Sequence, residues 1–339
     1  MPVPAAASWR RHAAAASSTS RILLLLVPVL LLLLFVLSRA PDLTLSPTAT
    51  TAASSRRLPT SISTGSTCLT IPRARTRSPP PASPVIASLV EGVPRPFFYS
   101  LADMGALPDR PHKNIARLLK GKHFRKPDIS ETIQQLLLAG KEGVAAGSGF
   151  PGAVVVDVGA NVGMASFAAA VMGFRVVAFE PVLENLQRIC DGVYLNRVQD
   201  RVVVYHAAAS DRVGNITMHK VIGRLDNSAI SATGAKLAFK SNEEIAVEVA
   251  TIPLDEVILD ADHVLMIKID VQGWEYHVLR GATKLLSRRK GDAPYLIYEE
   301  DERLLQASNS SAQEIRAFLS SFGYNHCTRH GTDAHCTKD

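Results

Sequence analysis

The stretch Val154-Val155-Val156-Asp157-Val158-Gly159-Ala160-Asn161-Val162-Gly163 decides the fold. Its continuous apolar run is typical of a strand buried on both faces of a parallel sheet. The run carries one acid and passes into a loop with two glycines four residues apart, and the segment that follows is rich in alanine, as in a helix. A glycine at such a turn lets the backbone approach a ligand closely, and the helix start offers free N–H groups. The stretch therefore predicts a strand, a ligand-binding loop and a helix.

Strand and helix patterns alternate outward from this stretch, beginning near Phe97. Repeated β–α units imply an open, mostly parallel sheet with helices on both faces. One segment, 245–252, alternates in the manner of a strand at an exposed edge. Asp128 and Glu131 form the pattern of a capping box at a helix start. We expect helices at 128–138, 163–172, 184–195, 275–286 and 312–319, and strands at 153–158, 175–179, 202–206, 245–252, 264–269 and 295–298.

The glycine loop excludes two common phosphate-binding patterns. A dinucleotide fingerprint needs glycine where Asn161 stands, and a P-loop needs a lysine that this loop lacks. The acid-x-Gly-x-x-x-Gly arrangement instead resembles the S-adenosylmethionine (SAM) loop of class I methyltransferases. That resemblance implies that Asp157, Gly159, Asn161 and Gly163 hold the amino-acid end of this cofactor.

A second acid follows the next strand, in Phe179-Glu180-Pro181, 23 residues after Asp157. An ionised carboxylate at a strand end can accept hydrogen bonds from both hydroxyls of a ribose. The alternative is a surface acid that caps the next helix. We favour ribose binding because of the loop that precedes it.

Four segments that occur in order carry a wider resemblance: Phe179-Glu180-Pro181, Ala208-Ala209-Ser210-Asp211, Val247 to Asp255, and Ile267-Lys268-Ile269-Asp270-Val271-Gln272-Gly273-Trp274-Glu275. Together they resemble the FkbM family of SAM-dependent methyltransferases over roughly residues 150–300. The resemblance implies a class I methyltransferase (Rossmann-like) fold and O-methylation of hydroxyls on sugars or natural products. The family commonly has Glu where this chain has Gln272, which puts any role of that carboxylate as a base in doubt.

Transfer of a methyl group to a hydroxyl needs a general base near the acceptor. Asp270 ends the fourth core strand, and Lys268 lies two residues earlier on the same strand face. One could be the base and the other its tuning partner, or the two could form a buried structural pair. Glu275 and Glu299 are further catalytic candidates near this rim, although Glu275 could also serve only to satisfy N–H groups at a helix start.

Further predictions concern Asp211, His206 and the acceptor pocket. Asp211 matches a family position near the adenine, and Asp211-Arg212-Val213-Gly214 also reads as a β-turn. His206 lies in a strand pattern and is expected to be packed. Residues 97–148 and 221–245 are our candidates for the acceptor pocket.

The N-terminus predicts a membrane anchor. An uncharged, leucine-rich run, 22–38, spans roughly 26 Å as a helix and is preceded by more positive charge than follows it. This pattern favours a single-pass type II protein with a cytosolic N-terminus. A cleaved signal peptide and an organelle transit peptide are the alternatives. The predicted organisation is a cytosolic tail (1–21), a transmembrane helix (22–38), a Ser/Thr/Pro-rich, disordered stem (39–96), a helical extension (97–148) and the SAM-dependent methyltransferase domain (149–339).

The charge separates the arm from the globular part. Residues 1–85 contain nine arginines and one acid, a net +8, which leaves 28 bases and 30 acids, a net −2, for the remainder. The folded part is therefore not expected to bind nucleic acid. An anchor, a stem and a C-terminal globule are the layout of a Golgi enzyme with a lumenal catalytic domain.

The four cysteines are interpreted from the oxidising lumen that this layout implies. Cys327 and Cys336, set among histidines, are expected to form a disulfide rather than a zinc site. Cys190 is expected to be a small buried hydrophobe within a helix, and Cys68 to be free or to link two chains.

The favoured function is a membrane-anchored, SAM-dependent O-methyltransferase that acts on a glycan or small glycosylated metabolite, without a metal. The alternative is a catalytically silent module that serves in trafficking or as a scaffold, for which Gln272 leaves room. A different Golgi enzyme class, such as a nucleotide-sugar glycosyltransferase, is the third candidate and ranks last.

Overall fold

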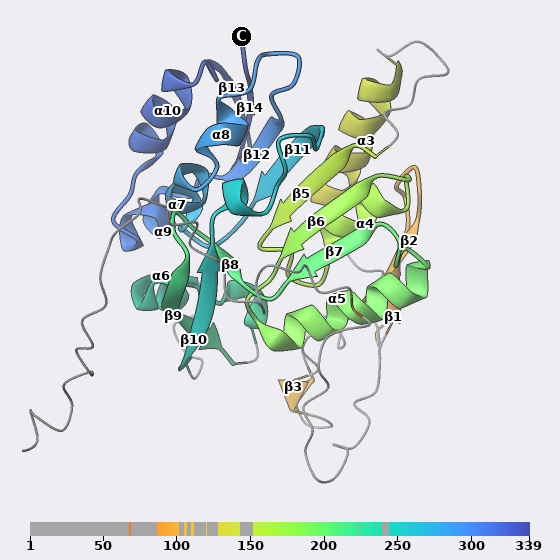
Figure 1. The fold of residues 1–339 in the computed structure, drawn as a ribbon. Helices are drawn as coiled ribbons and strands as arrows, with labels where there is room; N and C mark the ends of the chain where they lie inside the picture. The colour runs from red at the N-terminus through yellow and green to blue at the C-terminus, as the bar shows by residue number, and fades with distance from the viewer. Residues whose placement is uncertain are drawn as a thin grey trace, which may run out of the picture. The chain divides into compact units, whose positions relative to one another are not determined.

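The computed structural model describes residues 68, 87–101, 105–106, 110–111, 120, 128–142, 152–222, 224–238 and 244–339 (Figure 1). The chain divides into two units, Met1–Arg56 and Arg57–Asp339, and every described residue belongs to the second. The expected tail and transmembrane helix lie outside the described residues. Within those residues, no helix is both long and apolar enough to cross a membrane.

A seven-stranded sheet forms the centre of the second unit (Figure 1). Five neighbouring strands are parallel, and an antiparallel hairpin extends the sheet at one edge. This confirms the expected open, mostly parallel sheet. In sheet order the strands are β13 (His326–His330), β14 (Asp333–Thr337), β12 (Tyr295–Glu299), β11 (Val264–Ile269), β5 (Val154–Val158), β6 (Arg175–Phe179) and β7 (Val202–Tyr205).

The order of the strands places a crevice beside β5. The chain runs from β5 to β6 and β7 on one side, and returns to β11 and β12 on the other. Loops that leave the carboxyl ends of β5 and β11 therefore diverge, which is where open α/β sheets bind ligands. All five residues of β5 are buried, as the apolar run predicts.

Helices cover both faces of the sheet (Figure 1). On one face, α3 (Asp128–Glu142), α4 (Met164–Ala170) and α5 (Leu183–Asn196) share a core with β5 and β6. On the other, α7 (Glu275–Arg280), α8 (Thr283–Leu286), α9 (Glu302–Ala307) and α10 (Ala312–Ser321) do the same. Thus the apolar side chains of each layer are buried against the sheet.

The expected helix 275–286 is two helices, α7 and α8, that meet at Gly281. A Cβ on Gly281 would lie 2.0 Å from the carbonyl oxygen of Ser210. The backbone at Gly281 therefore packs directly against the loop after β8 (Ala208–Ala209). The helix α7 ends at Arg280, just before this contact.

A second, three-stranded sheet has the order β8-β10-β9. The expectation of an edge strand at 245–252 is wrong. β10 (Glu244–Ile252) lies in the middle, antiparallel to β9 (Gly214–Val221) and parallel to β8. The short elements η1 (Leu225–Asn227) and α6 (Ala232–Ala238) follow β9, and η2 (Leu254–Glu256) follows β10.

The folded part begins earlier than expected. β1 (Ala87–Val90) lies within the segment assigned to the stem and pairs with β2 (Phe97–Ser100). Val90 and Phe97 belong to the same core as α4. The segment 97–148 is also not purely helical, since β2, β3 (Gly105–Ala106) and β4 (Arg110–Pro111) precede α3.

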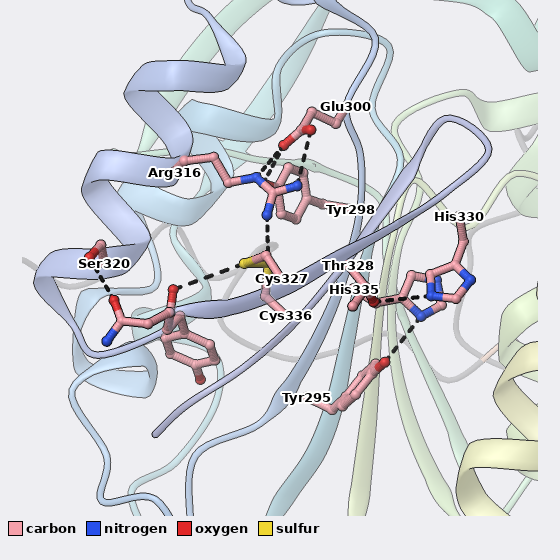
Figure 2. Close-up of a disulfide and its surroundings, with 12 residues drawn as sticks. Tyr295, Tyr298, Glu300, Arg316, Ser320, Cys327, Thr328, His330, His335 and Cys336 are labelled. Atoms are coloured by element: carbon pink, nitrogen blue, oxygen red, sulfur yellow. Dashed lines mark hydrogen bonds and ion pairs between the residues drawn. A yellow bond between two sulfur atoms is a disulfide. The ribbon is translucent and has the colours of Figure 1, made fainter.

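All four cysteines are paired. Cys327 and Cys336 form the expected disulfide across the C-terminal hairpin, and Figure 2 shows it on the side of Arg316 and Glu300. Cys68 is bonded to Cys190, so the expectations of a free or intermolecular Cys68 and of an unpaired Cys190 are wrong. No group of three or more metal-ligating side chains occurs among the described residues.

Candidate active site

The loop after β5 is held between its two neighbouring strands. The N–H groups of Gly159 and Ala160 both donate to the carbonyl oxygen of Phe179, at the end of β6. On the other side, a Cβ on Gly159 would lie 1.9 Å from the carbonyl oxygen of Asp270. Gly159 has a φ of 72° and Asn161 a φ of 53°, in the left-handed region. Only glycine fits the first of these positions, as the motif implies.

Glu180 connects this loop to β6. Its Oε2 accepts from the N–H of Asn161 at 2.7 Å, and its Oε1 accepts from the N–H of Val182 at 2.9 Å. The side-chain amide of Asn185 also donates to Oε1, at 3.4 Å. Burial raises the pKa of Glu180 to about 7, against the effect of these donors. The carboxylate therefore orients the loop, and its remaining lone pairs can accept further hydrogen bonds.

A cavity with about 600 Å³ of empty space, its open mouth included, lies over this loop. Three of its lining residues are large and apolar: Met218 of β9, and Leu225 and Ile230 from the segment between β9 and α6. Asn185 also lines it, and the Oδ1 of this buried side chain has no hydrogen-bond partner. Of the predicted site residues, Gly159, Asn161, Glu180 and Asp270 line this cavity. Asn185 was not among the predicted site residues, although it lies only five residues after Glu180, in the first turn of α5.

Asp157 and Lys268 form a buried ion pair below the loop. The Nζ of Lys268 lies 3.3 Å from Oδ1 of Asp157 and donates to the carbonyl oxygen of Gly159 at 2.8 Å. Ser166 donates to the other oxygen of Asp157 at 2.6 Å. Burial lowers the pKa of Lys268, but the carboxylates of Asp157 and Asp270 outweigh it and raise this pKa above its ordinary value. Lys268 is therefore a fixed cation, and Asp157 supports the loop without lining the cavity.

Asp270 is the accessible carboxylate of the site. Its side chain is 48% exposed, and its Oδ2 lies 3.9 Å from Nζ of Lys268. Gln272 donates through Nε2 to Oδ1 of Asp270 at 3.0 Å and to Oε2 of Glu299 at 3.1 Å. Burial, followed by the charge of Asp270, raises the pKa of Glu299 to about 9. Glu299 is thus protonated at neutral pH.

Glu275 holds the loop after β11 and does not line the cavity. Its Oε1 accepts from the N–H groups of Val271 and Gly273, at 3.0 and 3.2 Å. The side chain is fully buried, and burial raises its pKa to about 7. Of the two interpretations in the sequence analysis, the structure places Glu275 as a residue that satisfies backbone N–H groups.

Three further predicted positions lie away from the cavity. Asp211 pairs with α7, 3.8 Å from Nδ1 of His277 and 3.6 Å from Nη2 of Arg280, so the structure places it outside the expected adenine pocket. Gly163 precedes α4 and packs against the ring of Phe167. His206 is exposed and not packed, because β7 ends at Tyr205.

A second cavity, also with about 600 Å³ of empty space, borders the first along Gly159, Asn161 and Asp270. Lys268 and Asp333 add charged groups to it, and Ile129 of α3 contributes part of an apolar wall. The two segments proposed for the acceptor pocket are thus divided, since 221–245 contributes to the first cavity and 97–148 to the second.

The family model described as methyltransferase FkbM domain matches residues 157–325. Residues 157–325 are thus similar to an FkbM methyltransferase domain. The match begins at Asp157, covers β5 to α10 and includes every predicted site residue, and the sheet has the class I methyltransferase, Rossmann-like architecture that the resemblance implied.

Among solved structures, three similar chains are methyltransferases by their descriptions. A ribosomal protein L11 methylase from Lactobacillus delbrueckii subsp. bulgaricus is 16% identical, with 62% of this chain and 80% of that chain covered and a TM-score of 0.32. An O-methyltransferase family 2 protein from Planctomyces limnophilus in complex with apigenin is 14% identical, with coverages of 68% and 62% and a TM-score of 0.35. A T. thermophilus 16S rRNA methyltransferase in complex with AdoMet and guanosine is 12% identical, with coverages of 77% and 53% and a TM-score of 0.37. No curated protein sequence gave a significant match.

Proposed function

We propose that the FkbM domain transfers a methyl group from SAM to a hydroxyl group of a glycan or glycosylated metabolite. The observation that carries the proposal is the meeting of Gly159, Glu180 and Asp270 around one cavity. These residues come from the ends of three adjacent strands, β5, β6 and β11.

The residues of the first cavity fit SAM. Glu180 has lone pairs left for the ribose hydroxyls, and the unpaired Oδ1 of Asn185 offers a buried acceptor to the nucleoside. Met218, Leu225 and Ile230 supply an apolar wall that suits a purine ring. Gly159 and Asn161 lie where the two cavities meet, which suits the amino-acid and sulfonium end.

Asp270 is the base in this proposal, because its carboxyl group is accessible and common to both cavities. SAM, when bound, supplies a methyl group on a positively charged sulfur, so that transfer is an in-line displacement. Asp270 accepts the hydroxyl proton as the new carbon–oxygen bond forms. Gln272 donates a hydrogen bond that orients the carboxyl group of Asp270, and the cation of Lys268 lies 3.9 Å from its other oxygen.

Glu180→Ala is expected to weaken SAM and S-adenosylhomocysteine binding at least about 100-fold, because a buried acceptor is lost and the loop loses its bond at Asn161. Wild-type affinity should also fall as the pH drops below about 7, where Glu180 takes up a proton. Calorimetric titration of the full chain in detergent measures both effects, with the exposed Glu256→Ala as the control. A folded wild-type protein that binds neither compound would favour the silent module.

We also propose that the chain is a single-pass type II membrane protein of the Golgi, anchored by residues 22–38, with the FkbM domain in the lumen. Two disulfides, which use all four cysteines, support an oxidising compartment for the domain. Protease treatment of intact vesicles is expected to spare a C-terminal tag until detergent is added. Digestion of the tag in intact vesicles would contradict this topology.

A further inference from the structure

The second cavity is lined by both apolar and polar groups. Ile129, Met164, Ala165 and Ile297, from α3, α4 and β12, are apolar. The polar groups include Asp270, which lies at the boundary with the first cavity. A compound with hydroxyl groups and a C–H face, such as a pyranose ring, can use both kinds of contact.

The charges around the second cavity do not balance. Lys268 is the one cation among the described lining residues, and the buried carboxylate of Asp157 already pairs with it. Asp157 and Asp270 share this one cation, and Asp333 is a further acid in the lining. Burial raises the pKa of Asp333 and the charge of Asp270 adds to the rise, while Lys268 and His330 oppose it. Glu299, protonated at neutral pH, adds no charge.

Asp333 reaches the cavity because of the C-terminal hairpin. It is the first residue of β14, paired with Glu299 of β12 on one side and with His330 of β13 on the other. The N–H of Glu300 donates to the carbonyl oxygen of Thr332 at 2.7 Å, which fixes the turn to the end of β12. Figure 2 shows the hairpin with its disulfide toward Arg316, and with His330, His335 and Tyr295 on its other side. The backbone thus sets the position of Asp333 beside the site.

We propose that the second cavity binds the methyl acceptor and that Asp333 is its charge-selecting residue, which admits uncharged or cationic hydroxyl compounds and rejects anionic ones. The inference rests on the proposed methyltransferase function and adds the class of acceptor. An acceptor carboxylate or phosphate placed here would face Asp270 and Asp333 with no free cation among the described lining residues. Rejection by an unpaired like charge is an effective source of specificity.

The test uses the full chain saturated with S-adenosylhomocysteine and three probes of nearly equal size. Methyl β-D-glucopyranoside is neutral, its glucosiduronate carries one negative charge, and its 2-amino-2-deoxy analogue carries one positive charge. Ligand-observed NMR titration should show binding of the neutral and cationic probes and at least about tenfold weaker binding of the uronate. Asp333→Asn should bring the uronate to within about threefold of the neutral probe.

Asp292→Asn is the matched control, since it removes one acid from an exposed turn before β12 and should leave the discrimination unchanged. Asp333→Ser serves as a second variant if Asp333→Asn does not fold. Equal binding of the uronate by the wild type, discrimination that survives loss of Asp333, or no binding of any probe up to about 50 mM would each overturn the inference. Failure of S-adenosylhomocysteine to bind in the first place would instead count against the proposed function.

Discussion

Replacement of Gly159 by alanine is expected to lower the free energy of unfolding by about 3–5 kcal/mol and to abolish SAM binding. The new Cβ would lie 1.9 Å from the carbonyl oxygen of Asp270, which belongs to the backbone and cannot turn aside. Relief of this clash must separate the loop after β5 from the end of β11. Urea unfolding followed by circular dichroism measures the cost.

Gly173→Ala is the matched control for this effect. Gly173 has a φ of 99°, so alanine is strained there too, but a Cβ at this position meets no atom within 4 Å. Gly173→Ala should therefore lower the free energy of unfolding by about 1 kcal/mol, the cost of alanine in a left-handed backbone conformation. Equal losses in the two variants would mean that conformational strain, and not close approach to Asp270, is what requires glycine at position 159.

Lys268→Met is expected to destabilise the protein by about 3–5 kcal/mol, because it leaves the carboxylate of Asp157 buried with the hydroxyl of Ser166 but without an opposite charge. The carbonyl oxygen of Gly159 also loses its donor. Urea unfolding followed by circular dichroism measures the loss.

The double variant Asp157→Asn/Lys268→Met separates charge from packing. With no buried charge left, it should recover part of the stability that Lys268→Met loses. The free-energy losses of Asp157→Asn and of Lys268→Met, each measured alone, are the reference. If the loss in the double variant equals their sum, the ion pair is not the reason that both residues are buried, and Lys268 is not a fixed cation.

The sequence predicted the core strands well and the strands outside it poorly. β5 and β6 were found because buried parallel strands are nearly continuous apolar runs. β9, with the sequence GNITMHKV, carries a mixed pattern, so it was missed and its partner β10 was placed at an edge. β13 reads His-Cys-Thr-Arg-His, and it is a strand because of its pairing with β14 and not because of its own side chains.

The site shows the same division between local and long-range information. Gly159, Glu180 and Asp270 were found because each lies at the end of a recognisable strand. Asp157 also lies near the end of a recognisable strand, but its side chain is buried in the interior, where it contacts Lys268 and Ser166. Asp333 was missed because it lies more than 60 residues after Asp270, and only the sheet pairing brings it to the cavity.

The order of the last three strands of the sheet has a consequence for biosynthesis. β14 follows β13 in the chain but lies between β13 and β12, so during translation β13 emerges before the strand that will connect it to the sheet. Until β14 is made, the outer surface of β12 is an unpaired edge, of the kind that recruits strands from other chains. Pairing of this edge thus depends on residues 333–337. A nascent chain that stalls before them would expose an unpaired strand edge that can aggregate with other chains.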